Sequence, residues 1–502
     1  MRPHLFAGRA LATLAGAALF ALPLAAQQPA ASAPPRPRAA LAAQLDSLAR
    51  AAVASGRAAS VSVAVLRGAD TLLLRAYGRA DLEQEVAATP AAVYRIGSTT
   101  KQFTAAAILQ QVEQGRLALD DDLTKYLPAY PTGGRRVTIA ELLDHTSGIA
   151  DYTSLGDRFG VLATRDVPQD TLVALFAAAP FTFEPGTKWS YSNSGYYLLG
   201  IILERVTGEA WADYLARHVF PRAGLAQTRY CDDASLVPHR VRGYQLVGTQ
   251  FVNADPISMS IPYAAGALCS TPRELVRWMR ALREGKVVSA ASYRRMITAE
   301  GAARTPSPGD TSMHYGFGLF TRAIHGHRAV EHGGAINGFG SFLADFPDDS
   351  VTIAVLANTA GPVAGALGVQ LAGAVFGAPV KPWAPMPPAA APAAEVALTP
   401  AERARYVGVY RLRPAGDALR ASRMELTYHV YEENGRLMGW APGEAPDRLV
   451  AEGDGVFHAA LAPTARITFV TDGAAAGAPV RRISIVAGGS MLSGERVVGT
   501  ER

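Results

Sequence analysis

Residues 94–115 read YRIGSTTKQFTAAAILQQVEQG, which places a glycine turn before a helix that we expect to begin at Ser98 and run to Gly115. Gly97 permits the tight turn. Residues three apart share a helix face, so Lys101 lies one turn from Ser98 and can reach its hydroxyl. A serine hydroxyl becomes a nucleophile when a base takes its proton, and lysine is such a base when burial lowers its pKa. The stretch predicts a Ser98–Lys101 pair; the alternative is a capped surface helix with a solvated lysine.

A second motif, Tyr191-Ser192-Asn193, lies in residues 183–208, FEPGTKWSYSNSGYYLLGIILERVTG. It occupies a loop directly before a helix that we expect from Tyr196 onward. A tyrosine oxygen in such a place can pass a proton, and Asn193 offers both a donor and an acceptor for a substrate amide. The alternative is a purely structural loop in which the tyrosine packs and the asparagine turns the chain.

A third motif, His332-Gly333-Gly334, lies in residues 331–346, EHGGAINGFGSFLADF. Glycines let a substrate lie against a strand edge, and the Ala335 amide paired with that of Ser98 would form an oxyanion hole. The alternative is a glycine turn beside a structural histidine. His145, in the helix stop TIAELLDHTSGI of residues 138–149, is interpreted as structural rather than as a base.

One predicted hairpin precedes these motifs in the sequence, and a second follows them. Residues 60–78, SVSVAVLRGADTLLLRAYG, turn at residues 68–70, and the strand-like runs 339–346 and 351–357 are joined by PDDS. A helix is expected near residues 41–54, before the first hairpin. The sequence between the hairpins is mostly helical, with expected helices that include residues 101–114, 139–143, 196–206, 211–218 and 271–284. This order predicts a mixed α+β domain, residues 41–377, whose sheet uses both ends of the domain.

The amino-acid composition of the chain changes after residue 377. Residues 378–397 are rich in Pro and Ala and predict a linker. Residues 398–502 hold short strand-like segments separated by turns, which predict a small antiparallel β domain or barrel.

The N-terminus has the layout of a secretory signal peptide. Residues 1–9 are short and basic, residues 10–26 are apolar (ALATLAGAALFALPLAA), and we expect cleavage after Ala26, followed by a Pro/Ala-rich spacer over residues 27–40. The alternative is an uncleaved anchor, but the stretch is short and Pro23 interrupts it. The expected location is the periplasm or the medium, with no membrane span after cleavage.

Composition and cysteine content exclude several classes of protein. The net charge of +5 is spread over basic residues interleaved with acids, so nucleic acid is not an expected partner. The histidines and cysteines show no metal-ligand spacing, so no metal site is expected. Cys231 and Cys269 would enter an oxidising compartment, where they form either one disulfide, which we favour, or two buried thiols.

Taken in order, the three motifs and the LLDHTSGI segment closely resemble the serine β-lactamase and penicillin-binding-protein family over about residues 40–375. The resemblance implies an antiparallel sheet built from both chain ends, flanked by helices and an all-helical insertion. It also implies that Ser98 is acylated, that Lys101 and Tyr191 handle protons, and that Asn193 contacts the substrate amide. His332 and Gly334 would occupy a strand motif that is often K-T-G. The C-terminal segment resembles the lipocalin-like domains appended to some members.

The expected function is therefore acyl transfer by an exported serine hydrolase that needs no cofactor. Because His332 replaces a fixed lysine charge, D-amino-acid peptides, amides or esters are favoured over substrates with a carboxylate anchor. The alternatives are a class C-like β-lactamase and a catalytically silent penicillin-binding or envelope scaffold. The expected partner is a small-molecule or peptide substrate, and the C-terminal domain would allow oligomerisation.

Overall fold

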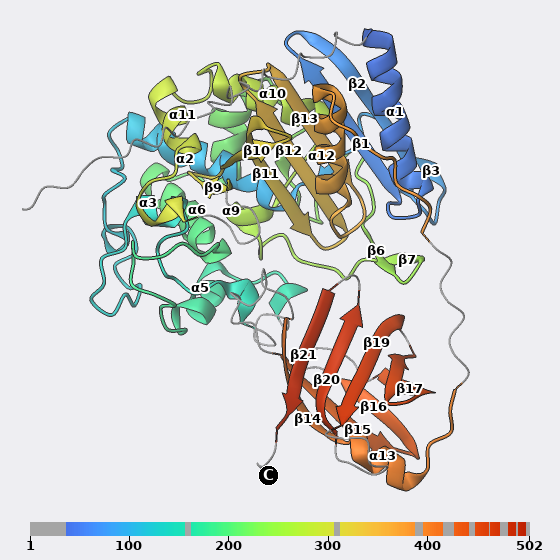
Figure 1. Ribbon diagram of the computed structural model, residues 1–502. Coiled ribbons are helices and arrows are strands. Elements are labelled where there is room, and N and C mark those ends of the chain that lie inside the picture. Colours follow the sequence, from blue (N-terminus) through green and yellow to red (C-terminus); the bar gives the residue numbers. More distant parts are fainter. Residues whose placement is uncertain are drawn as a thin grey trace, which may run out of the picture. The chain divides into compact units, whose positions relative to one another are not determined.

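Figure 1 shows the computed structural model of the chain. The described residues are 37–155, 162–305, 312–386, 395–414, 426–440, 447–460, 462–471, 480–487 and 490–497. The expected signal peptide and residues 27–36 of the spacer lie outside them, as do residues 387–394 of the linker.

One large antiparallel sheet organises the first domain. Its strand order is β3-β2-β1-β13-β12-β11-β10-β9. The bounds are β1 Ser60–Arg67, β2 Asp70–Asp81, β3 Val86–Ala87, β9 His314–Tyr315, β10 Phe320–Ile324, β11 His327–Ile336, β12 Phe339–Phe346 and β13 Val351–Ala357. Strand β1 pairs directly with β13, with Val61 opposite Ala357. The prediction that both ends of the domain share one sheet is confirmed.

Both faces of this sheet are covered, which explains why β13 is buried at every position. Helices α1 (Arg38–Ala54) and α12 (Val363–Phe376) cover one face, where they meet Val63, Val65 and Val355 in one core cluster. Helix α10 (Pro272–Arg283) packs on the other face, where Ala64 and Leu356 belong to a second cluster. Successive strand residues thus enter different cores, as the two-residue period of a strand requires.

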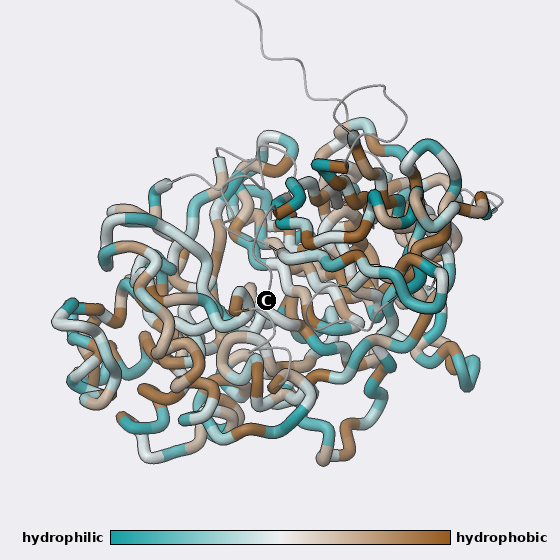
Figure 2. Tube along the Cα trace, turned by 90° about the horizontal axis from the view of Figure 1, so that it is seen from below, coloured by the Kyte–Doolittle hydropathy of each residue, from teal (hydrophilic) through white to brown (hydrophobic). Residues whose placement is uncertain are grey.

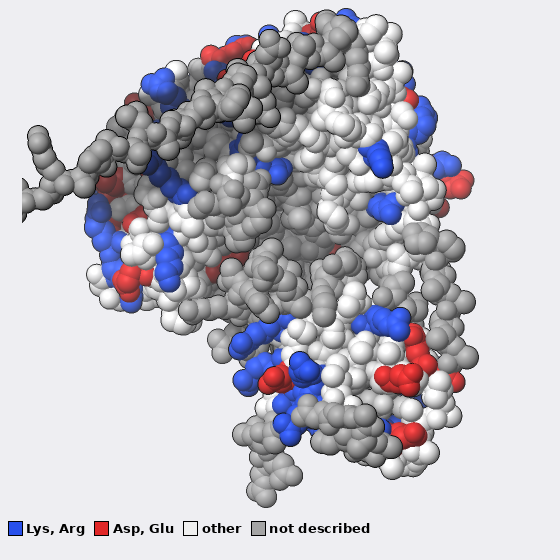
Figure 3. Space-filling model, in the orientation of Figure 1, with Lys and Arg blue, Asp and Glu red and all other residues white. Residues whose placement is uncertain are grey.

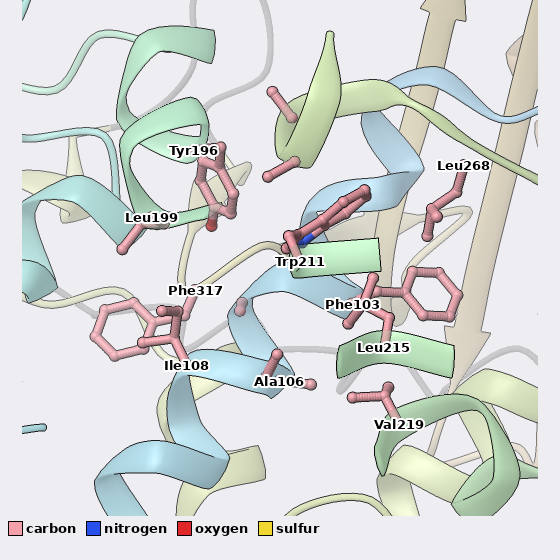
Figure 4. Close-up of a cluster of buried hydrophobic side chains, with 14 of the residues drawn as sticks. Phe103, Ala106, Ile108, Tyr196, Leu199, Trp211, Leu215, Val219, Leu268 and Phe317 are labelled. Carbon is pink, nitrogen blue, oxygen red and sulfur yellow. The ribbon is translucent and has the colours of Figure 1, made fainter. Parts of the chain in front are cut away.

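The second cluster extends through the helical part of the domain and fixes the helix that carries Lys101. Helix α2 (Lys101–Glu113) is buried along most of its length, and Figure 4 shows Phe103, Ala106 and Ile108 projecting from it among buried side chains that include Trp211. The other helices are α3 Ile139–Leu143, α5 Gln169–Ala177, α6 Asn193–Thr207, α7 Trp211–Tyr214, α8 Phe220–Ala223, α9 Tyr263–Gly266 and α11 Ala290–Ile297.

This part of the domain also contains short strands, which the expected all-helical insertion did not include. Strands β4 (Tyr94–Arg95), β8 (Leu268–Ser270) and β5 (Arg229–Tyr230) form a three-stranded sheet, and β6 (Tyr244–Val247) pairs with β7 (Gln250–Asn253). Runs of two to four residues are too short to show a strand period in sequence.

The C-terminal segment forms a closed barrel, which confirms the predicted β domain. After α13 (Pro400–Tyr406) come β14 Gly408–Pro414, β15 Leu426–Glu433, β16 Arg436–Trp440, β17 Asp447–Gly453, β18 Val456–Ala459, β19 Ala462–Thr471, β20 Val480–Ala487 and β21 Ser490–Arg496. The rings of Tyr406, Tyr410, Phe457 and Phe469 pack against one another in its core. An eight-stranded barrel has an interior of about the size that side chains fill.

Charged and apolar residues are mixed along the chain. Within the described ranges, no helix has both the length and the apolar character needed to cross a membrane, and hydrophobic and hydrophilic residues alternate over short stretches of the trace in Figure 2. On the face drawn in Figure 3, basic and acidic side chains occur together on the barrel, where Arg403 pairs with Glu432 at 3.0 Å.

Candidate active site

Ser98 lies in a tight turn directly before α2. Residues Gly97–Thr100 form a 3₁₀ turn, and the α-helix itself begins at Lys101 and ends at Glu113, slightly inside the expected range. Gly97 has φ +51°, a left-handed conformation that glycine adopts at little cost. The turn leaves Ser98 partly exposed while Lys101, one turn further, is fully buried. Of the two residues, only Ser98 is in contact with solvent.

The Lys101 amine has three oxygen neighbours from three different elements. Its Nζ lies 3.1 Å from Ser98 Oγ, 2.7 Å from Asn193 Oδ1 and 2.9 Å from the Ala265 carbonyl oxygen on α9. Burial lowers the pKa of Lys101 to about 7, against a smaller opposing effect of the Asp151 carboxylate. A neutral amine has two hydrogens, which the two carbonyl-type oxygens can accept. Its lone pair is then left for the Ser98 hydroxyl.

Tyr191 completes the group that the sequence predicted. Its ring centre lies 4.8 Å from Lys101 Nζ. The Tyr191 hydroxyl is buried without a hydrogen bond of normal geometry, but it is close enough to Ser98 for that interaction to lower its pKa. Burial has the larger effect and raises the pKa of Tyr191 well above 10. The structure thus brings Ser98, Lys101 and Tyr191 together with the phenol in its neutral form.

Asn193, the first residue of α6, is held at both ends of its amide. Its Oδ1 accepts from Lys101, and its Nδ2 donates to Asp151 Oδ2 at 3.3 Å. The Asn193 backbone N–H donates to Asp151 Oδ1 at 3.1 Å. One N–H of the side-chain amide is left over for a substrate. Asp151 was not among the predicted site residues, although it lies only two residues after the HTSGI motif in the sequence.

His332 lies on β11, buried among aromatic rings. Its Nδ1 lies 2.5 Å from the Gly333 carbonyl oxygen and its Nε2 lies 3.1 Å from the Tyr315 hydroxyl. Only an Nδ1–H can bond to a carbonyl, so Nε2 accepts the Tyr315 proton. Burial, aided by the Lys101 charge, lowers the pKa of His332 to about 3. His332 is therefore neutral at pH 7.

The predicted oxyanion hole depends on a close approach of β11 to the Ser98 turn. A Cβ at Gly97 would lie 2.9 Å from the Ala335 backbone nitrogen, and a Cβ at Gly334 would overlap the Ile96 carbonyl oxygen. Only glycines allow the two backbones to lie this close. Ala335 is exposed and Ser98 is partly exposed, and the Ala335 backbone nitrogen lies close to the turn that carries Ser98.

His145 and Tyr315 are buried and pack against the Tyr191 ring. His145 Nδ1 accepts from the Ser192 backbone N–H at 3.2 Å, and its ring centre lies 4.3 Å from that of Tyr191 and 4.5 Å from that of Tyr315. Burial lowers the pKa of His145 well below its usual value, followed by the charges of Lys101 and His332. These contacts are those of a structural residue that supports the Tyr191 loop.

Comparison with known proteins agrees with this geometry. The sequence profile of the Beta-lactamase family matches residues 45–376. The chain belongs to the Beta-lactamase family. The match includes every residue of the site described above and ends where α12 ends.

Relatives within the Beta-lactamase family are distant. PbpX of Bacillus subtilis (strain 168), assigned by its name to the penicillin-binding proteins, is 27% identical over 292 residues, which are 58% of this chain and 68% of PbpX. Protein flp of Staphylococcus aureus (strain MRSA252) is 25% identical over 321 residues, 63% of this chain and 62% of flp. The matched part thus spans roughly two thirds of these curated relatives.

Two solved structures extend the comparison. A D-stereospecific amidohydrolase from Streptomyces sp. is 28% identical with a TM-score of 0.56, covering 65% of this chain and 95% of that one. An octameric penicillin-binding protein homologue from Pyrococcus abyssi is 22% identical with a TM-score of 0.58, covering 90% of this chain and 99% of that one. The second likeness shows that the shared fold extends into the C-terminal barrel.

The two cysteines of this Beta-lactamase-family chain lie together in the interior of the domain. Cys231 and Cys269 are buried free thiols in one small core cluster, and a hydrogen bond between them lowers the pKa of Cys231 and raises that of Cys269. A disulfide between them stays a prediction. The two thiols are free in this structure, but they lie within hydrogen-bond distance of each other.

Proposed function

We propose that this chain is an exported serine hydrolase that transfers an acyl group to Ser98 and releases it to water. The observation that carries the proposal is the set of contacts around Lys101 Nζ. Two of its oxygen neighbours belong to Asn193 and Ala265 and can take the amine hydrogens, so the lone pair is directed at Ser98 Oγ 3.1 Å away. With a pKa of about 7, a large part of Lys101 is neutral at pH 7 and able to accept the hydroxyl proton.

The reaction follows from these positions. Ser98 Oγ attacks the carbonyl carbon as its proton moves to Lys101, and the Ser98 and Ala335 amides stabilise the oxygen that becomes negative. The proton then passes, with Tyr191 as relay, to the leaving amine or alcohol as its bond to carbon breaks. Because burial keeps Tyr191 neutral, Tyr191 relays a proton while Lys101 serves as the base. Water attacks the ester by the reverse path.

The proposed substrate is a D-amino-acid peptide, amide or ester. A neutral His332 supplies no fixed positive charge at the β11 position, so recognition of a substrate carboxylate has no support there. The Streptomyces relative, 28% identical, is named a D-stereospecific amidohydrolase, which supports the same class.

The test is covalent labelling of the whole chain with a fluorophosphonate, read by intact-protein mass spectrometry. Wild type should gain one label, and Ser98→Ala should gain none. Ser62→Ala, a buried serine on β1 outside the site, should label like wild type. Exposure to a panel of D-amino-acid amides, esters and β-lactams then reports which acyl group is accepted and how fast it is released. A label on the Ser98→Ala chain would refute the proposal.

A further inference from the structure

Asp151 contacts the proposed catalytic group through Asn193. It stands directly before the 3₁₀ turn Tyr152–Ser154, where its side chain caps the turn by accepting from Thr153 Oγ1 at 2.6 Å and from the Thr153 N–H at 3.4 Å. The same carboxylate accepts from the backbone and the side chain of Asn193. Four donors thus converge on one carboxylate, which holds it in a fixed position beside Asn193.

This carboxylate determines which way the Asn193 amide faces. In the observed orientation Nδ2 points to a carboxylate and Oδ1 to the Lys101 amine. The flipped amide would place an oxygen against the carboxylate and an N–H₂ group against the amine, losing both hydrogen bonds. A neutral side chain at position 151 would remove most of this preference. One of the two hydrogens of neutral Lys101 would then lose its fixed acceptor, the Asn193 oxygen.

Asp151 is also the charge that acts on Lys101. The titratable groups that surround the amine come from four other segments, and burial favours the neutral form of each: Tyr191, Tyr196, His145 and His332. Against burial, the Asp151 carboxylate raises the pKa of Lys101. The same charge raises the pKa of Tyr191. The Asp151 charge therefore partly offsets the effect of burial on the pKa of Lys101. It adds to the effect of burial on the pKa of Tyr191, which stays neutral.

We propose that Asp151 is a positioning residue that holds Asn193 in one orientation and, through its charge, sets the pH range over which Ser98 is acylated. The inference rests on the proposed acylation of Ser98. Lys101 must be neutral to accept the serine proton, so the labelling rate of wild type should rise with pH and level off above about 7, the pKa of the amine. Removing a negative charge favours the neutral amine, so this rise should move to lower pH.

The experiment measures fluorophosphonate labelling rates of the full chain from pH 5 to pH 9. Asp151→Asn, which keeps the size and an acceptor, should move the rise to lower pH by about one unit and reduce the plateau rate, because the amine is a weaker base. Asp151→Glu retains the charge and should keep the rise at the wild-type pH. Asp213→Asn, whose side chain is 61% exposed on α7, is the matched control and should change nothing.

Each outcome decides between the two proposals. A labelled wild type whose rise stays at the same pH in Asp151→Asn overturns the role of Asp151 alone, whereas a wild type that takes no label at Ser98 overturns the proposed function and this inference with it. A merely structural role would lower stability and rate without moving the rise. If Asp151→Asn does not fold, as judged by circular dichroism, Asp151→Ser is measured with the same expectation.

Discussion

At the scale of single residues, the site holds a buried amine whose protonation is unfavourable. Lys101 is fully buried, and burial lowers its pKa from 10.5 to about 7. In the unfolded chain the amine is exposed and keeps its proton up to about pH 10.5. Between these two pH values the unfolded state binds one more proton than the folded state, so stability attributable to Lys101 rises with pH.

Replacing Lys101 with Met should make this contribution measurable. The free energy of unfolding of wild type, relative to Lys101→Met, should increase by roughly 3 kcal/mol between pH 7 and pH 9.5. All other titrating groups are common to both chains and cancel in the difference. Urea unfolding followed by tryptophan fluorescence at the two pH values gives the measurement. A difference that stays flat with pH would mean that the buried amine keeps its usual pKa.

At the scale of elements, the contact between β11 and the Ser98 turn depends on Gly334. A Cβ at this position would overlap the Ile96 carbonyl oxygen and lie 2.5 Å from Ser341 Oγ. Gly334→Ala should therefore push β11 away from the turn, separate the Ser98 and Ala335 amides, and slow labelling of Ser98 by roughly 10²-fold or more. The cost in stability should be about 1–3 kcal/mol.

The neighbouring glycine is the control. A Cβ at Gly333 would meet only the Ser341 carbonyl oxygen, at 3.5 Å, an ordinary contact. Gly333→Ala should thus label at close to the wild-type rate and melt at close to the wild-type temperature. Equal losses in both variants would show that the strand tolerates no side chain here and would remove the argument for a shaped oxyanion hole.

The sequence predicts those elements whose pattern is local. Strands β12 and β13 are found at their predicted bounds because both are mainly apolar runs separated by turn residues. The Ser98, Lys101 and Tyr191 cluster follows from motif order. Helix α9 has only four residues and no period, so the Ala265 carbonyl that accepts from Lys101 is invisible in sequence. Asp151 is also missed, because its importance depends on the fold bringing it to Asn193.

At the scale of the whole molecule, the described cores divide the chain. The two clusters on either side of the large sheet contain no residue after Trp383, and the barrel cluster contains none before Leu398. A domain with its own core can fold by itself. A chain spanning residues 37–386 should therefore fold and label at Ser98 without the barrel.

The first residues of the predicted linker should contribute to the stability of that domain. Arg57 donates to the Ala384 carbonyl at 2.7 Å, Met386 N–H donates to the Ser55 carbonyl at 2.9 Å, and Trp383 packs against the core beside α12. A chain ending at Gly377 loses all three contacts and should be less stable than one ending at Met386 by roughly 2 kcal/mol. Thermal melts of the two chains test this. Identical melting temperatures would show that residues 378–386 add nothing to the domain.

The pairing of β1 with β13 has a consequence for biosynthesis. The Ala59 N–H donates to a threonine side chain 300 positions further along the chain, at the end of β13. During translation the first strand leaves the ribosome long before its central neighbour exists, and contacts between such distant segments form slowly. The nascent polypeptide must therefore remain open until almost the entire domain has been synthesised. The export proposed above would make use of this delay, because a chain must still be unfolded when it is threaded through a translocation channel.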